Sequence, residues 1–264
     1  MAFARVNGIV LHHDVRGNAD APALVFSNSR GTDFRIWDEV AARLAGDFRI
    51  VLYDKRGHGL SEAPPAPYTI DDHVGDLAAL LDHLGIARAA VVGLSVGGLI
   101  AQGLAAARPD LVAALVLIGT APKLGTAETW NVRIETVAAK GIAALADDIL
   151  PRWFTAAFRS PDNPAFAGYR AMLARSPAEG YAGTCAALRD ADLTASTRAL
   201  RLPALCLVGD QDGSTPPDLV RATAALIAGA EFEVIAGAGH IPCVEQPAAT
   251  AALIGDFLRR TGWR

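Results

Sequence analysis

The sequence predicts an α/β protein, in which a mostly parallel central sheet is flanked by helices and carries an inserted helical cap. Short apolar runs typical of strands alternate with helix-like stretches, and this rhythm is broken once, in the middle of the chain. A chain of 264 residues is long enough for one large domain with a sizeable core. We expect residues 1–120 and 193–264 to form the core and residues 121–192 to form the cap.

Six apolar runs are the candidate strands. The opening segment, residues 5–17, has the pattern of a hairpin that turns at Asn7-Gly8, and we expect it at one edge of the sheet. The candidate strands are 23–29, 48–54, 89–95, 115–120, 204–210 and 232–240.

The clearest helix is predicted over residues 70–86, where apolar residues recur at intervals of three and four. Asp71 and Asp72 stand where a helix N-terminus favours negative charge, and Gly85 is placed to end the helix.

The cap prediction depends on the change of pattern between Ala121 and Asp192. Alanine-rich helical stretches and two proline-containing breaks, "SPDNP" and "SPAEG", replace the strands there. We expect the large side chains of Trp130, Trp153 and Phe154 to pack mainly within this segment.

Composition excludes several classes of partner. The net charge of −4 offers no basic patch for nucleic acid, and no apolar run reaches the roughly 18 to 20 residues of a membrane span.

The start lacks the features of a secretory signal, so we expect a cytoplasmic protein. Three widely spaced cysteines suit neither a disulfide framework nor a zinc site, and we expect them to be buried. The expected partner is a small molecule, and no oligomeric state is specified.

The segment "VVGLSVGGLI" places Ser95 between Gly93 and Gly97, after a strand and before a helix. This G-x-S-x-G pattern is typical of a nucleophile elbow, in which a tight turn lifts the serine oxygen out of the sheet. A buried structural serine is the alternative.

A serine nucleophile needs a base, and the base needs an orienting acid. Asp210 and Asp212 lie just beyond a candidate strand, and His240 stands at the end of the last one, in the order serine, acid, histidine. We choose Asp212 because it lies further out, whereas Asp210 is placed to bond nearby backbone amides. The alternative for Asp212 is a turn-forming role before Gly213.

The other histidines compete less well for the role of base. Two lie on the predicted helix, two lie in the first hairpin without acids at metal-ligand spacing, and one lies in a glycine-rich loop that could border the pocket. These residues are His73 and His83, His12 and His13, and His58.

Attack on a carbonyl produces an oxyanion, which needs hydrogen-bond donors. We expect one from the backbone N–H of Val96, directly after the serine, and one from the loop after strand 23–29. We assign the second to Arg30, with Ser29 as the less favoured register.

Nearly the whole chain resembles the α/β-hydrolase superfamily and, within it, the 3-oxoadipate enol-lactonases of the β-ketoadipate pathway for aromatic breakdown. The resemblance is carried by "SNSRGTDFRIWD", "YDKRGHGLSEAP", "GLSVGGLIAQGLAAARPDLV", "ETWNVRI", "EGYAGTCAALRDADL", "VGDQDGSTPPDLV" and "GAGHIPCVEQP". It implies the α/β-hydrolase fold, no cofactor, no metal, an anionic lactone substrate, and catalytic Ser95, Asp212 and His240. One departure is Arg30, where the family usually has an apolar residue.

The expected activity is therefore opening of the enol-lactone through an acyl-enzyme. Arg133, with Trp130 three residues earlier on the same helix face, is a candidate for the substrate carboxylate, and a solvent-exposed arginine is the alternative. The competing functions are carboxylesterase, carbon–carbon bond hydrolase, perhydrolase-like enzyme, and a binding protein without catalysis. A nicotinamide dehydrogenase is disfavoured because no segment reads G-x-G-x-x-G.

Overall fold

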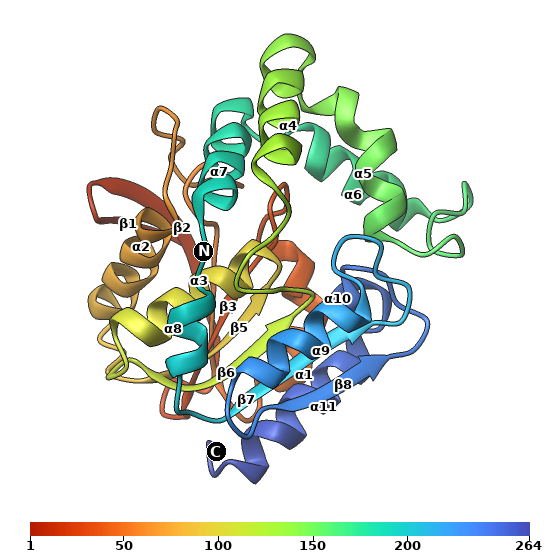
Figure 1. The fold of residues 1–264 in the computed structure, drawn as a ribbon. Coiled ribbons are helices and arrows are strands. Elements are labelled where there is room, and N and C mark those ends of the chain that lie inside the picture. The colour runs from red at the N-terminus through yellow and green to blue at the C-terminus, as the bar shows by residue number, and fades with distance from the viewer.

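The computed structural model describes residues 1–264, and one eight-stranded sheet forms its centre (Figure 1). The strand order is β1-β2-β4-β3-β5-β6-β7-β8; β2 pairs antiparallel with β1 and β4, and all other neighbours are parallel. The predicted fold class is confirmed. The strands are β1 (Ala2–Val6), β2 (Ile9–Gly17), β3 (Ala23–Ser27), β4 (Arg49–Tyr53), β5 (Ala89–Leu94), β6 (Val112–Ile118), β7 (Ala204–Gly209) and β8 (Glu231–Ile235).

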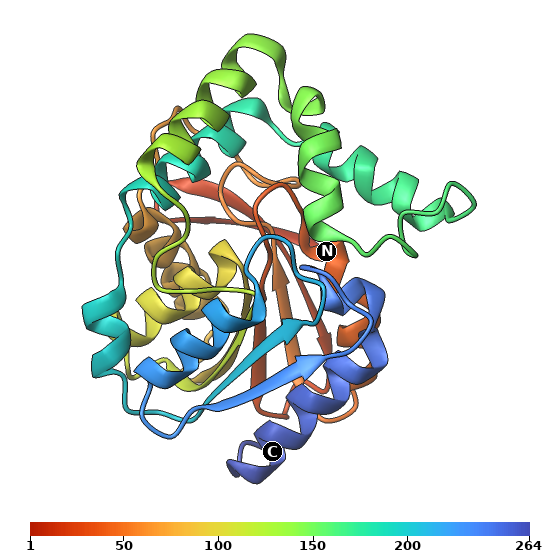
Figure 2. The same cartoon turned by 45° about the vertical axis from the view of Figure 1, so that its right-hand side comes forward.

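Helices cover both faces of the sheet (Figures 1 and 2). On one face α1 packs against α11, and on the other α2, α3, α8 and α9 lie side by side. The central strands are buried on both faces, which explains their unbroken apolar runs. The core elements are η1 (Phe34–Trp37), α1 (Asp38–Leu44), α2 (Ile70–His83), α3 (Val96–Ala107), α8 (Thr194–Ala199), α9 (Pro217–Leu226), α10 (Pro242–Glu245) and α11 (Pro247–Arg260).

The chain between β6 and α8 contains helices and loops but no strand, and its helices lie over one end of the core in both views (Figures 1 and 2). Trp130, Trp153 and Phe154 are all buried in or under this layer. We keep residues 121–192 as the proposed cap. Its helices are α4 (Ala127–Lys140), η2 (Ile142–Leu145), α5 (Ala146–Trp153), α6 (Pro164–Ala174) and α7 (Ala178–Asp190).

Several local expectations can be compared with the structure. The hairpin turn at Asn7-Gly8 is confirmed, with both residues at positive φ and β1 at the sheet edge. The three cysteines are free and buried, as expected. The structure contains no helix with the length and apolarity of a membrane span.

The predicted ends of most elements are one or more residues too late, and two elements end at least three residues earlier than expected. The helix α2 stops at His83, and Gly85, at φ +65°, follows as the left-handed residue that ends it. The strand predicted over 232–240 stops at Ile235, because Gly237, at φ +70°, turns the chain out of the sheet. His240 therefore lies on a loop beyond the strand.

Candidate active site

Ser95 occupies the sharp turn between β5 and α3. Its backbone has φ 58° and ψ −119°, a conformation that residues with a side chain rarely adopt. A Cβ atom on Gly93 would lie 2.2 Å from the carbonyl oxygen of Gly97, and one on Gly97 would lie 2.1 Å from that of Ser27. Glycine is therefore required on both sides of the turn. The Ser95 residue itself is partly exposed, unlike the buried residues around it.

His240 and Asp212 form a buried pair on the loops after β8 and β7. The distance from His240 Nδ1 to Asp212 Oδ2 is 2.8 Å, and the two side chains are 2% and 0% exposed. Asp212 Oδ1 accepts the backbone N–H groups of Ser214 and Thr215 at 2.7 and 2.8 Å, and Oδ2 accepts the Thr215 hydroxyl at 2.7 Å. The carboxylate is thus fixed by four donors.

These contacts keep the Asp212 carboxyl ionised. Burial alone would raise its pKa, but the charge and hydrogen bond of His240, together with the bonds from Thr215, lower the pKa below its usual value. An ionised carboxylate only accepts hydrogen bonds, so Nδ1 of His240 carries a proton. In the neutral ring, Nε2 is then left as the proton acceptor.

The end of β6 connects Ser95 to this pair. The Thr120 hydroxyl donates to the carbonyl oxygen of Ser95 at 2.7 Å. At the adjacent Gly119, a Cβ atom would lie 3.0 Å from Asp212 Oδ2 and 3.1 Å from His240 Nδ1. The structure therefore brings the three predicted residues to one end of the sheet. The ring of His240 is hydrogen-bonded only through Nδ1, so no hydrogen bond joins it to the Ser95 hydroxyl here.

Two backbone N–H groups are available next to Ser95 and in the loop after β3. Val96 is the first residue of α3, and the first N–H groups of a helix have no intrahelical acceptor. The N–H of Arg30 donates to no other group of the chain.

The loop that carries Arg30 is held by a buried lysine that sequence reasoning missed. Lys55 Nζ donates to the carbonyl oxygen of Ser29 at 2.6 Å, and the Thr32 hydroxyl donates to the same oxygen at 2.8 Å. Lys55 is 1% exposed, and burial lowers the pKa of its ammonium group well below the usual value. Its position just beyond the carboxyl end of β4 was the available signal.

The Arg30 side chain extends from the core to the cap. Its Nη1 donates to the Tyr181 hydroxyl and lies 3.6 Å from Cys185 Sγ. Its Cζ lies 5.0 Å from the centroid of the Trp130 ring, and Arg133 Cζ lies 5.4 Å from the same ring. The structure thus groups the two tentative substrate-binding residues, Trp130 and Arg133, with the side chain of Arg30, which we expected only as an oxyanion donor through its backbone. Tyr181 and Cys185 on α7 join this group.

Asp210 and His58, the other candidates near the site, each contact a backbone group of the chain. Asp210 accepts the N–H of Ala238 at 3.1 Å, as expected for the carboxylate that bonds backbone amides. His58 is buried, with Nδ1 3.1 Å from the carbonyl oxygen of Arg56, and burial lowers its pKa well below the usual value. No group of three histidine, cysteine, aspartate or glutamate side chains is placed to hold a metal ion.

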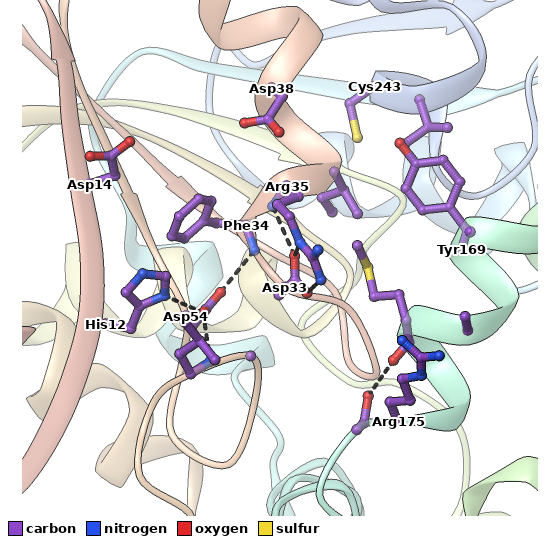
Figure 3. A pocket seen from close by; sticks show the side chains of 18 of the residues that line it. His12, Asp14, Asp33, Phe34, Arg35, Asp38, Asp54, Tyr169, Arg175 and Cys243 are labelled. Atoms are coloured by element: carbon purple, nitrogen blue, oxygen red, sulfur yellow. Dashed lines mark hydrogen bonds and ion pairs between the residues drawn. The ribbon is translucent and has the colours of Figure 1, made fainter. Parts of the chain in front are cut away.

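A large cavity lies beside these residues and not among them. It has a volume of about 1050 Å³ and lies between η1 and α6 (Figure 3). None of Ser95, Asp212 and His240 lines it. Its most buried acid is already bonded, because Asp54 accepts from His12 at 2.7 Å and from the backbone of Phe34 at 2.9 Å. We therefore locate the candidate active site by the chemistry of Ser95, Asp212 and His240, and not by this cavity.

Comparison with known proteins shows which family the chain resembles over most of its length. A family model described as the alpha/beta hydrolase fold matches residues 22–247. The chain is 37% identical over 252 residues to 3-oxoadipate enol-lactonase 2 of Acinetobacter baylyi, covering 96% of this chain and 94% of the relative. The crystal structure of the enol-lactonase from Burkholderia xenovorans LB400 is 40% identical, with a TM-score of 0.95 over 98% of this chain and all of that one.

A third similar protein is an esterase and not an enol-lactonase. A thermophilic esterase from Thermogutta terrifontis is 28% identical, with a TM-score of 0.92 over 98% of both chains. The fold, the family model and these relatives together show that the chain belongs to the α/β-hydrolase fold family.

Proposed function

We propose that the protein is a serine hydrolase that opens 3-oxoadipate enol-lactone to 3-oxoadipate. The observation that carries this proposal is the match to two enol-lactonases over nearly the whole chain, at 37% and 40% identity. The buried Asp212–His240 pair beside the strained Ser95 turn supports a hydrolytic mechanism.

The first half of the proposed reaction forms an acyl-enzyme. Ser95 Oγ attacks the lactone carbonyl carbon while its proton passes to His240 Nε2, and Asp212 stabilises the resulting imidazolium. The N–H groups of Val96 and Arg30 bind the oxyanion. Collapse of the tetrahedral intermediate breaks the ring C–O bond, and His240 returns a proton to the enol oxygen.

The second half releases the product. Because the substrate is a ring, the leaving enol stays attached to the acyl group, and it tautomerises to the ketone. Water then attacks the acyl carbon as His240 removes its proton, and Ser95 leaves with that proton restored. No cofactor or metal takes part in this scheme. We further propose that Arg133 binds the carboxylate of the substrate and that the ring of Trp130 packs beside this guanidinium in the binding site, in a reaction of the β-ketoadipate pathway.

The test is steady-state turnover of enzymatically generated 3-oxoadipate enol-lactone by the wild type and by Ser95→Ala. We expect measurable kcat/KM for the wild type and its loss in the variant. A wild-type rate no greater than that of the variant would reject the lactonase.

A carboxylesterase is the second candidate, and the 28% identical esterase favours it. Turnover of a simple ester without turnover of the lactone would support this alternative. A vinylogous diketone serves as the probe for carbon–carbon bond hydrolysis. Labelling of Ser95 by a fluorophosphonate is expected for every one of these hydrolases, and folded protein that is not labelled would instead indicate a binding protein.

A further inference from the structure

Arg30 and Arg133 are two buried or half-buried cations without an acidic partner. Arg30 is 7% exposed, and neither guanidinium has a carboxylate within ion-pair distance. Arg56 provides the comparison within the same molecule. It is equally buried, and its guanidinium binds Asp76 through two hydrogen bonds of 2.6 and 2.7 Å. The fold thus pairs a buried arginine with an acid where the charge is structural.

The groups that do contact Arg30 are neutral. Burial raises the pKa of the Tyr181 hydroxyl and that of the Cys185 thiol, so both stay protonated near neutral pH. Arg30 Nε is buried and has no hydrogen-bond partner at all. Burial and the nearby charge of Arg30 lower the pKa of Arg133. An uncompensated pair of cations in such surroundings is unfavourable unless an anion joins it.

The pair lies where the cap meets the proposed catalytic loops. Both guanidinium groups lie near the ring of Trp130, whose own N–H is bonded to the Leu124 carbonyl. A Cβ atom on Gly31, next to Arg30, would lie 3.2 Å from the Trp153 ring. The carbonyl of the same Trp153 accepts the backbone N–H of His240 at 2.8 Å. Trp153 of the cap thus contacts both the loop that carries Arg30 and the loop that carries His240.

We propose that Arg30 and Arg133 form one anion site, in which a guanidinium from the core and one from the cap hold the same carboxylate group. This adds a core residue, Arg30, to the carboxylate contact proposed above for Arg133 in the cap. Arg30 is the specificity-determining residue of this site, and the anion also holds the cap against the core. The inference rests on the proposed function only in treating the bound carboxylate as part of a substrate.

The test measures binding without turnover, in the Ser95→Ala background. Isothermal titration compares the dicarboxylate adipate with adipamide, a neutral molecule of the same length. We expect adipate to bind at least about tenfold more tightly, because hydrogen bonds to a charged group are the stronger ones. Arg30→Met and Arg133→Met are each expected to remove most of this preference.

The matched control is Arg88→Met, because Arg88 is exposed and lies in the turn before β5, in the core. It is expected to leave adipate binding unchanged. Arg30→Gln can still donate to Tyr181 and replaces Arg30→Met if that variant does not fold. Equal binding of adipate and adipamide by the parent, or an unchanged preference in the neutral Arg30 variant, would overturn the proposal. Since no lactone is used, failure of the lactonase assay leaves this result intact, and the reverse also holds.

Discussion

His240 Nδ1 and Asp212 Oδ2 lie 2.8 Å apart, and both side chains are almost fully shielded from solvent. A neutral amide in place of Asp212 would present either a donor that repels Nδ1–H or a weaker acceptor. We expect Asp212→Asn to lower kcat by about 10³- to 10⁴-fold, because the ring would be held in the wrong tautomer. Steady-state kinetics on the best substrate checks this.

The control for that variant is Asp210→Asn. Asp210 accepts one backbone N–H, from Ala238, and an asparagine oxygen can accept the same bond. We expect kcat to stay within a fewfold of the wild type. A larger loss of kcat in Asp210→Asn than in Asp212→Asn would show that Asp210, and not Asp212, is the acid that orients His240.

Some residues of the candidate site could be predicted from the sequence, and others could not. Ser95, Asp212 and His240 were accessible because each follows a candidate strand, and parallel strands deliver their carboxyl ends to one edge. Thr215 was not, because its role depends on a contact between loops that meet only in the fold. Lys55 also follows a candidate strand, but its bond to the Ser29 carbonyl depends on such a contact too. The direction of the Arg30 side chain was likewise set by Tyr181, which lies 151 positions away in sequence.

Element ends were predicted less well than element types. The strand before His240 was extended too far, since the pattern "EVIAGAGH" keeps its apolar character through Ala236. The positive φ of Gly237 ends the strand, and such a conformation is permitted by the sequence but not specified by it.

Gly119 provides a second test of the proposal that Asp212 and His240 meet beside the end of β6. A methyl group there would lie 3.0 Å from Asp212 Oδ2 and 3.1 Å from His240 Nδ1, so it must displace one of them. We expect Gly119→Ala to lower kcat by about a hundredfold, as small displacements of catalytic groups do. Kinetics and thermal unfolding are measured together.

Gly141→Ala is the matched control for Gly119→Ala. Gly141 also has positive φ, at +73°, but nothing lies within 4 Å of the position of its Cβ atom. Gly141→Ala therefore introduces the same kind of backbone strain without a steric clash. If both variants lose activity equally, the loss comes from strain and the proposed crowding at Gly119 is wrong.

Lys55 is expected to act as a positioning residue. Lys55→Met keeps the length of the side chain but removes the 2.6 Å bond to the Ser29 carbonyl, so the adjacent N–H of Arg30 is less firmly placed. We expect kcat to fall about tenfold to a hundredfold with little change in KM, because the oxyanion forms only during the reaction. An equal rise in KM with kcat unchanged would point to substrate binding instead.

His73 makes the stability of the fold depend on pH. It is 1% exposed, its Nδ1 has no partner, and burial, with the charges of Lys55 and Arg56, lowers its pKa to about 3. In the unfolded chain a histidine binds its proton near pH ~6.5. Between these pH values the unfolded state binds more protons than the folded state. The contribution of His73 to the free energy of unfolding is therefore complete above about pH 6.5 and falls with decreasing pH, by up to about 1.4 kcal/mol per pH unit.

Urea unfolding between about pH 7 and about pH 5 measures how the free energy of unfolding changes with pH, and we expect this slope to be smaller in His73→Phe. A His73→Phe slope equal to that of the wild type would contradict the assignment.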